Sequence, residues 1–120
     1  MPYQMQLIEP GIVRISFSGG SLGADELDDF IRDFHGYLDA TTPEAPINIL
    51  TIVEAPGAKL ASKTRKAFTN LNADKRVGKA ATLGVDRYAR VLIGFMLKAT
   101  GRDNIRFFDT EEQALAWLRE

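Results

Sequence analysis

The feature that most constrains this chain is the apolar run from Ile47 to Val53, INILTIV. It is interrupted only by Asn48 and Thr51, and it lies between Pro46 and the turn-forming residues 54–57. A strand with one solvent-exposed face would alternate apolar and polar residues, so this β-branched run predicts a strand that is buried on both faces. A strand of that kind needs helices on both sides of its sheet, and the rest of the chain must supply them.

The residues before this run predict a hairpin followed by a helix. Residues 4–9 and 12–18 have the alternation that is typical of strands, and a Pro-Gly pair between them marks a tight reversal. Apolar residues then recur at helical spacing over about residues 25–39, with Asp25 at the start of the expected helix.

Strands and helices alternate after the central run. We expect helices over about residues 59–72 and 87–100, and strands over residues 79–85 and 104–108. Thr110 and Gln113 form a capping-box pattern, which predicts a closing helix. Such alternation indicates parallel strands joined by helical crossovers. The expected fold is a single α/β domain over residues 1–120, in which an N-terminal hairpin leads into a mixed sheet with helices packed against it.

Composition narrows the class of protein. The 120 residues suit one domain, which buries roughly two-thirds of the surface that its unfolded form exposes. With no cysteine and one histidine, disulfides and thiolate chemistry are excluded, and we expect no metal centre and no cofactor. The longest apolar run, from Val91 to Leu97, is far below the roughly 20 residues that span a bilayer, and the first residues lack a signal-peptide pattern. We therefore expect a cytoplasmic protein.

The charges are distributed unevenly along the chain. Residues 1–58 carry 2 basic and 9 acidic side chains, residues 59–98 carry 10 and 2, and residues 99–120 carry 3 and 5. The basic middle part would attract anionic lipid, an acidic partner or nucleic acid, unless the acidic first helix neutralises it in the fold. Nucleic acid is the least favoured of these partners, because no aromatic interleaving or known motif accompanies the basic residues.

Two stretches carry a resemblance to a known family. The strand IVRISFSGG with the helix and buried strand after it, and the closing segment NIRFFDTEEQALAWL, are similar to SpoIIAA-like proteins. These are relatives of the STAS domains, which include anti-sigma factor antagonists. In the antagonists the central strand leads into an Asp-Ser pair whose serine is phosphorylated, whereas this chain has Glu54, Ala55, Pro56 and Gly57 there. The resemblance therefore implies a STAS-like fold without the phosphoryl switch, and a module that binds a ligand or associates with a membrane.

The helix expected after Asp86 is more apolar than packing on one sheet requires. At about 100° per residue its polar side chains and glycine fall in one narrow arc, and apolar residues fill a sector of roughly 240°. Ile93 and Leu97 lie on one flank of that sector, and we take this flank as the surplus. The candidate surface consists of Arg87, Arg90, Ile93, Gly94, Met96, Leu97 and Lys98.

Three explanations for the surplus stay open. Neighbouring segments of the chain cover it, a second copy of the chain covers it, or it contacts a lipid-like ligand or a membrane surface. Basic residues beside an apolar sector are typical of an interfacial helix, and Gly94 would allow a close approach.

Carboxylates end the three strands expected to be parallel. Glu54, Asp86 and Asp109 would meet at the edge of the sheet where α/β proteins usually bind ligands. Acidic residues are also common at helix starts, and no base or nucleophile motif accompanies these three. We therefore predict that the protein is not an enzyme.

The sequence thus favours a non-catalytic SpoIIAA-like module. It would bind an apolar or lipid-like small molecule, or associate with a membrane surface, through the helix over residues 87–98. The alternative is a regulatory protein-interaction module, resembling an anti-sigma factor antagonist without its serine, that acts as a homodimer or on another protein.

Overall fold

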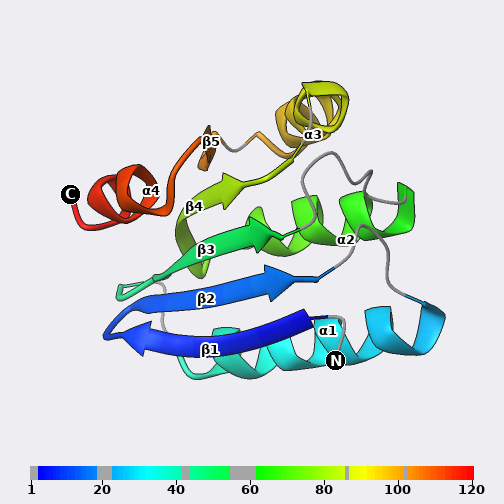
Figure 1. Ribbon diagram of the computed structural model, residues 1–120. Helices are drawn as coiled ribbons and strands as arrows, with labels where there is room; N and C mark the ends of the chain where they lie inside the picture. Colours follow the sequence, from blue (N-terminus) through cyan, green and yellow to red (C-terminus); the bar gives the residue numbers. More distant parts are fainter. Residues whose placement is uncertain (1–2, 19–22, 42–43, 55–61, 86, 102) are drawn as a thin grey trace.

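The computed structural model describes residues 3–18, 23–41, 44–54, 62–85, 87–101 and 103–120. It is an α/β structure in which a five-stranded mixed sheet is flanked by four helices (Figure 1). In chain order the elements are β1 (Tyr3–Glu9), β2 (Ile12–Phe17), α1 (Ala24–Asp39), β3 (Ile47–Val53), α2 (Ser62–Asn72), β4 (Val77–Leu83), α3 (Arg87–Thr100), β5 (Ile105–Phe108) and α4 (Glu111–Leu118).

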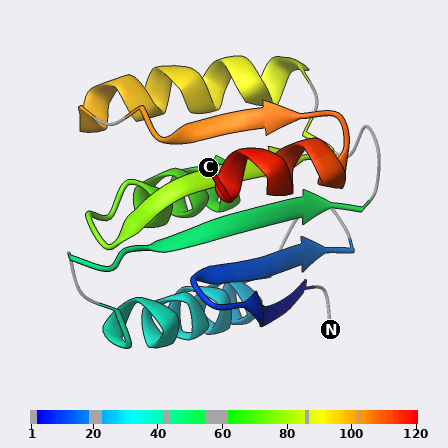
Figure 2. The same cartoon turned by 90° about the vertical axis from the view of Figure 1, so that its left-hand side faces the viewer.

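The strands stand in the sheet in the order of the chain, β1-β2-β3-β4-β5. β1 is antiparallel to β2, and the pairs from β2 to β5 are all parallel. Right-handed crossovers between neighbouring parallel strands place their helices on one face of a sheet. α1, α2 and α3 accordingly share one face, whereas α4 lies on the other, as Figure 2 shows for α4 in front and α1 and α2 behind.

The larger core lies between the sheet and the three crossover helices. Its centre is a group of aromatic rings, in which Phe30 of α1 contacts Tyr3 of β1, Phe17 of β2 and Phe34 at centroid distances of 5.5, 5.3 and 6.0 Å. α2 adds Phe68 and Leu71, and α3 adds Ile93 and Leu97. Contacts with both β1 and β2 show that α1 lies across these two strands.

A smaller core lies beneath α4. Ala114 and Leu118 of this helix are buried against Ile12, Leu50 and Leu83 of the sheet. Side chains on the two faces of β3 therefore enter different cores, as expected for a strand that is buried on both sides. Thr110 caps α4 as predicted, since its side chain accepts a hydrogen bond from the backbone N–H of Gln113.

The predicted order of elements is confirmed, but the starts of α1 and β4 differ from the prediction. α1 begins at Ala24, and Glu26 caps it by accepting a 2.8 Å hydrogen bond from the Gly23 N–H, so Asp25 is not the cap. β4 begins at Val77, two residues earlier than expected, because the pairing of β3 with β4 shifts between Ile47 and Ile49. α2 is described from residue 62, and the predicted start over residues 59–61 lies outside the described residues. No helix in the described part of the chain has the length and apolar character to cross a membrane.

An ionic cluster fastens the end of α1 to the turn before β4. Arg76 donates side-chain hydrogen bonds to both carboxylate oxygens of Asp74 at 3.0 Å, and another to Asp39 at 2.8 Å. These bonds to Arg76 hold the pKa of Asp74 below its usual value, although partial burial acts in the opposite direction. The folded state therefore favours the ionised form of the Asp74 carboxyl group.

This cluster makes stability depend on pH. A carboxyl group whose pKa is lowered in the folded state stabilises it above the unfolded pKa of about 4, and this contribution is lost as the pH falls through the lower, folded value. We expect Asp74→Asn to lower the free energy of unfolding by about 1 kcal/mol at pH 7 and to have little effect at the acid end. Urea unfolding at pH 7 and at a pH below the lowered, folded pKa of Asp74 measures both values. Asp28→Asn, on the exposed side of α1, is the control, and an equal loss in the two variants would contradict the assigned role of Asp74.

Candidate functional site

The exposed side of α3 differs from the predicted one. Ile93 is fully buried and Leu97 is 6% exposed, so the flank that was predicted to be surplus belongs to the core. The exposed apolar side chains are Tyr88, Val91 and Phe95, at 66%, 59% and 67% exposure. Ile93 and Leu97 are therefore removed from the candidate surface, and these three residues take their place.

The position of α3 explains the correction. The helix lies beside α2 and beyond β4 towards the β5 end of the sheet, so its buried side faces these elements (Figure 1). Residues 88, 91 and 95 are spaced by three and four positions, which places them on one stripe of the opposite side. We call Tyr88, Val91 and Phe95, with the basic residues Arg87 and Lys98 beside them, the α3 surface.

The basic residues of the sequence prediction fall into two groups. Arg87 and Lys98 are exposed, and the Lys98 Nζ lies 5.9 Å from the centroid of the Phe95 ring. Arg90 instead turns toward the sheet, where its Nε donates a 3.0 Å hydrogen bond to the Val85 carbonyl and its guanidinium lies 5.5 Å from the Phe107 ring. Arg90 thus stabilises the fold, while Arg87 and Lys98 give the α3 surface a positive charge.

A groove runs between α3 and the edge strand β5. It has a volume of about 420 Å³ and is lined by Ile93, Gly94, Leu97, Lys98, Gly101, Asp103, Ile105 and Phe107. Four of the predicted surface residues therefore meet here, two of them as its apolar wall. A Cβ atom at Gly94 would have no atom within 4 Å, so this glycine leaves the mouth of the groove open. Met96, the remaining predicted residue, is half-buried.

The strand-end carboxylates do not form a cluster among the described residues. Glu54 follows β3 and Asp109 follows β5, with β4 between the two strands. Asp109 is 3.9 Å from the Arg90 guanidinium and otherwise exposed, and Asp86 lies outside the described residues. The described chain holds no group of three or more His, Asp or Glu side chains that suits a metal ion.

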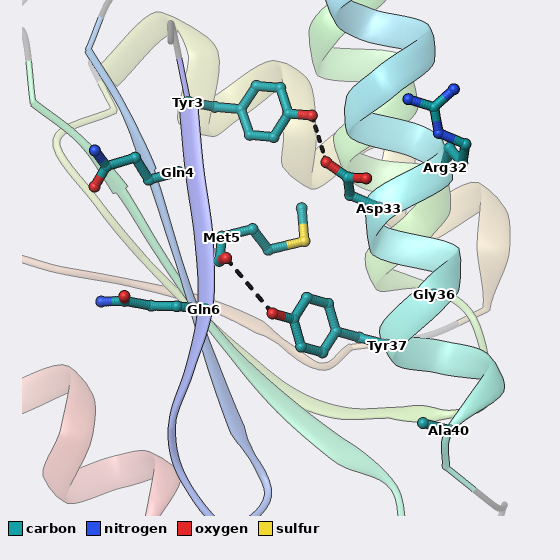
Figure 3. Close-up of a pocket in the computed structure, with 9 residues that line it drawn as sticks. All are labelled: Tyr3, Gln4, Met5, Gln6, Arg32, Asp33, Gly36, Tyr37 and Ala40. Atoms are coloured by element: carbon teal, nitrogen blue, oxygen red, sulfur yellow. Dashed lines mark hydrogen bonds between the residues drawn. The ribbon is translucent and has the colours of Figure 1, made fainter.

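A second hollow, which the sequence did not predict, lies beside β1. This groove of about 990 Å³ is lined by Tyr3, Gln4, Met5, Gln6, Arg32, Asp33, Gly36, Tyr37 and Ala40 (Figure 3). The Tyr3 hydroxyl donates a 2.7 Å hydrogen bond to Asp33, and the Tyr37 hydroxyl donates a 3.5 Å bond to the Met5 carbonyl. Burial, followed by the bond to Asp33, raises the pKa of the Tyr3 hydroxyl, so it stays a neutral donor. The sequence did contain a feature that sets this strand apart, because it carries no charged side chain from Tyr3 to Ile8.

Large exposed apolar side chains thus gather in two places in the described structure, β1 with Leu7 and Ile8, and the α3 surface. The two places lie at opposite ends of the sheet (Figure 1). Comparisons of the chain with protein-family models, with curated proteins and with solved structures gave no significant match.

Proposed function

We propose that the protein is a non-catalytic module that associates with an anionic membrane surface through α3. The observation that carries this proposal is the α3 surface, where three large apolar side chains remain exposed on one helix stripe between Arg87 and Lys98. Aromatic and aliphatic residues flanked by cations are the composition of a helix that lies in the headgroup region of a bilayer.

The apolar side chains supply one part of the binding free energy. Complete transfer of a Val or Phe side chain from water is worth about 1.5–3 kcal/mol, so the exposed remainder of Val91 and Phe95 is worth about 1–2 kcal/mol each. Tyr88 adds a ring with a polar tip, which suits the boundary between acyl chains and headgroups.

The cations supply the other part. Each basic side chain near an anionic leaflet adds about 1 kcal/mol, which makes Arg87 and Lys98 together comparable to the two apolar residues. Lys63 and Lys66 are exposed on the neighbouring helix α2 and extend the positive field. A combined value of about 4–6 kcal/mol corresponds to reversible attachment, which salt would weaken.

Two further observations support a lipid partner. The groove beside the α3 surface is lined by the apolar side chains of Leu97, Ile105 and Phe107, with Lys98 and Asp103 as its charged residues. Its apolar part suits an acyl chain, and Lys98 suits the charged headgroup. The resemblance to SpoIIAA-like proteins that lack the phosphorylated serine also favours a membrane-associating module, and the mixed α/β sheet with its N-terminal hairpin is compatible with that family.

Vesicle flotation tests the proposal. We expect the protein to float with vesicles of phosphatidylcholine and phosphatidylserine at low salt, to float weakly with phosphatidylcholine alone, and to be released at high salt. The double variant Val91→Ser, Phe95→Ser should lower the vesicle affinity at least tenfold, and Arg87→Ala with Lys98→Ala should remove the preference for anionic lipid.

The matched control is Ile8→Ser, which removes an exposed apolar side chain at the opposite end of the sheet and should leave flotation unchanged. Circular dichroism verifies that each variant is folded. Absence of flotation at low salt would refute the membrane proposal, and so would an equal loss of binding in the Ile8 control.

A further inference from the structure

β1 forms a sheet edge whose regular part, from Tyr3 to Leu7, carries no protective device in the described structure. It is the end strand of the sheet, and no described strand pairs with its outer side. Natural sheets usually guard a long edge with a charged side chain, a proline or a covering segment. The stretch from Tyr3 to Ile8 has no charge and no proline, and the first charge, Glu9, is held at 2.9 Å by Arg119.

The opposite edge of the sheet is guarded. β5 has four residues against seven in β1, and it carries the exposed cation Arg106. Leu7, on β1, is 56% exposed although it is a large apolar residue. The contrast identifies β1 as the edge that is suited to pairing with another strand.

We propose that β1 pairs antiparallel with β1 of a second copy of this chain, so that the two sheets become continuous across a two-fold axis. In such a pair, two residues face each other when their numbers add up to twice the number of the residue on the axis. The irregularity in the β1–β2 pairing lies between Leu7 and Glu9, so the regular part of the strand is centred on Met5. With Met5 on the axis, Tyr3 faces Leu7 of the other copy, and Gln4 faces Gln6.

This register is self-complementary. An uncharged strand can face a copy of itself without bringing like charges together, and glutamine side chains can exchange hydrogen bonds across the pair. The Tyr37 bond to the Met5 carbonyl is long, at 3.5 Å, so an incoming backbone N–H can replace it. Pairing would also cover the exposed side chain of Leu7.

The position of α1 also favours a second copy. Because α1 lies across β1 and β2, the two-fold axis would place the two α1 helices over strands in the order β2-β1-β1-β2. Strands are about 4.8 Å apart, so the helix axes would be about 10 Å apart, which is a normal helix-packing distance. Gly36 on this side has nothing within 4 Å of a Cβ position, so a second helix has room to approach.

The charges at this helix contact are matched as well. Arg32 and Asp33 both line the groove beside β1 (Figure 3), and they have opposite signs. Each is already paired within its own copy, Arg32 with Asp29 at 2.6 Å and Asp33 with the Tyr3 hydroxyl at 2.7 Å, so the contact would bring no unpaired charge to the axis. The groove of about 990 Å³ would then be the space that the second copy closes.

The native mass and a single-cysteine variant test the inference. We expect a dimer at micromolar concentration by native mass spectrometry and analytical ultracentrifugation, and Leu7→Lys should raise its dissociation constant at least tenfold. The chain has no cysteine, so Met5→Cys introduces a unique thiol beside the axis. Residues that face each other in an antiparallel pair are about 4.5–5.5 Å apart at Cα, which a disulfide can bridge, so this variant should cross-link on mild oxidation.

Ile8→Cys is the matched control, because the two copies of residue 8 would be six positions apart, roughly 20 Å, and should not cross-link. A monomer at all concentrations would overturn the inference. A dimer that Leu7→Lys leaves intact, or that the Ile8 cysteine cross-links as fast as the Met5 cysteine, would also overturn it. The test variants of the vesicle experiment, at Val91 and Phe95, lie on α3 and not on this edge, so a monomer would not by itself contradict the membrane proposal.

Discussion

Gly84→Ala is expected to lower the free energy of unfolding by about 2–5 kcal/mol, a large part of the stability of a small domain. Gly84 follows β4 with a φ of +81°, a conformation that costs a residue with a Cβ about 1–2 kcal/mol. A Cβ atom there would also collide with the Val53 carbonyl oxygen at the end of β3. Backbone atoms of a central strand cannot move aside cheaply, so the clash adds to the cost.

Gly101→Ala separates the two contributions. Gly101 has a φ of +76° after α3, but a Cβ atom there would have nothing within 4 Å. Its substitution should therefore cost only about 1–2 kcal/mol. Urea unfolding of both variants gives the comparison, and equal losses would show that the collision with Val53 does not contribute.

Phe30→Ala is expected to lower the free energy of unfolding by about 3–5 kcal/mol. The Phe30 ring is fully buried and packs against Tyr3, Phe17 and Phe34, which come from two strands and from its own helix. Its removal leaves a cavity that these rings cannot fill without leaving their own positions. Thermal and urea unfolding measure the loss.

Phe95→Ala is the matched control for that loss. It removes the same side chain from the exposed α3 surface, so the stability should change by no more than about 0.5 kcal/mol. A large loss at Phe95 would mean that the ring is covered in the folded protein, and this would also count against α3 as a membrane-binding surface.

Periodicity in the sequence was sufficient to predict most of the fold. The continuous apolar run of β3 and the helical spacing in α1 and α3 reflect burial, which the sequence records directly. The start of β4 was predicted at Lys79 and not at Val77, because Gly78 interrupts the strand pattern where the pairing with β3 is irregular. A register shift depends on the neighbouring strand and leaves no periodic signal in its own sequence.

The orientation of α3 could not be predicted from its sequence alone. Ile93 and Phe95 lie in the same broad apolar sector, and only the neighbouring α2 and sheet decide that Ile93 is buried and Phe95 exposed. The contacts of Arg90 could not be predicted for the same reason, because Val85 and Phe107 lie outside α3. A prediction that β1 lies at the edge would also have required the strand order, because that order decides which strand lacks a neighbour.

The strands follow one another in the sheet in the same order as in the chain, and this affects how the protein can fold during synthesis. Each strand pairs with the strand translated just before it, so no strand has to wait for one that is made later, although each parallel pair must first close a helical crossover. β1 and β2 can form first, and every later strand-helix unit extends the sheet at its newest edge. The face of the sheet beneath α4 stays uncovered longest, because that helix follows all five strands. Nascent chains that lack α4 should therefore expose Ile12, Leu50 and Leu83.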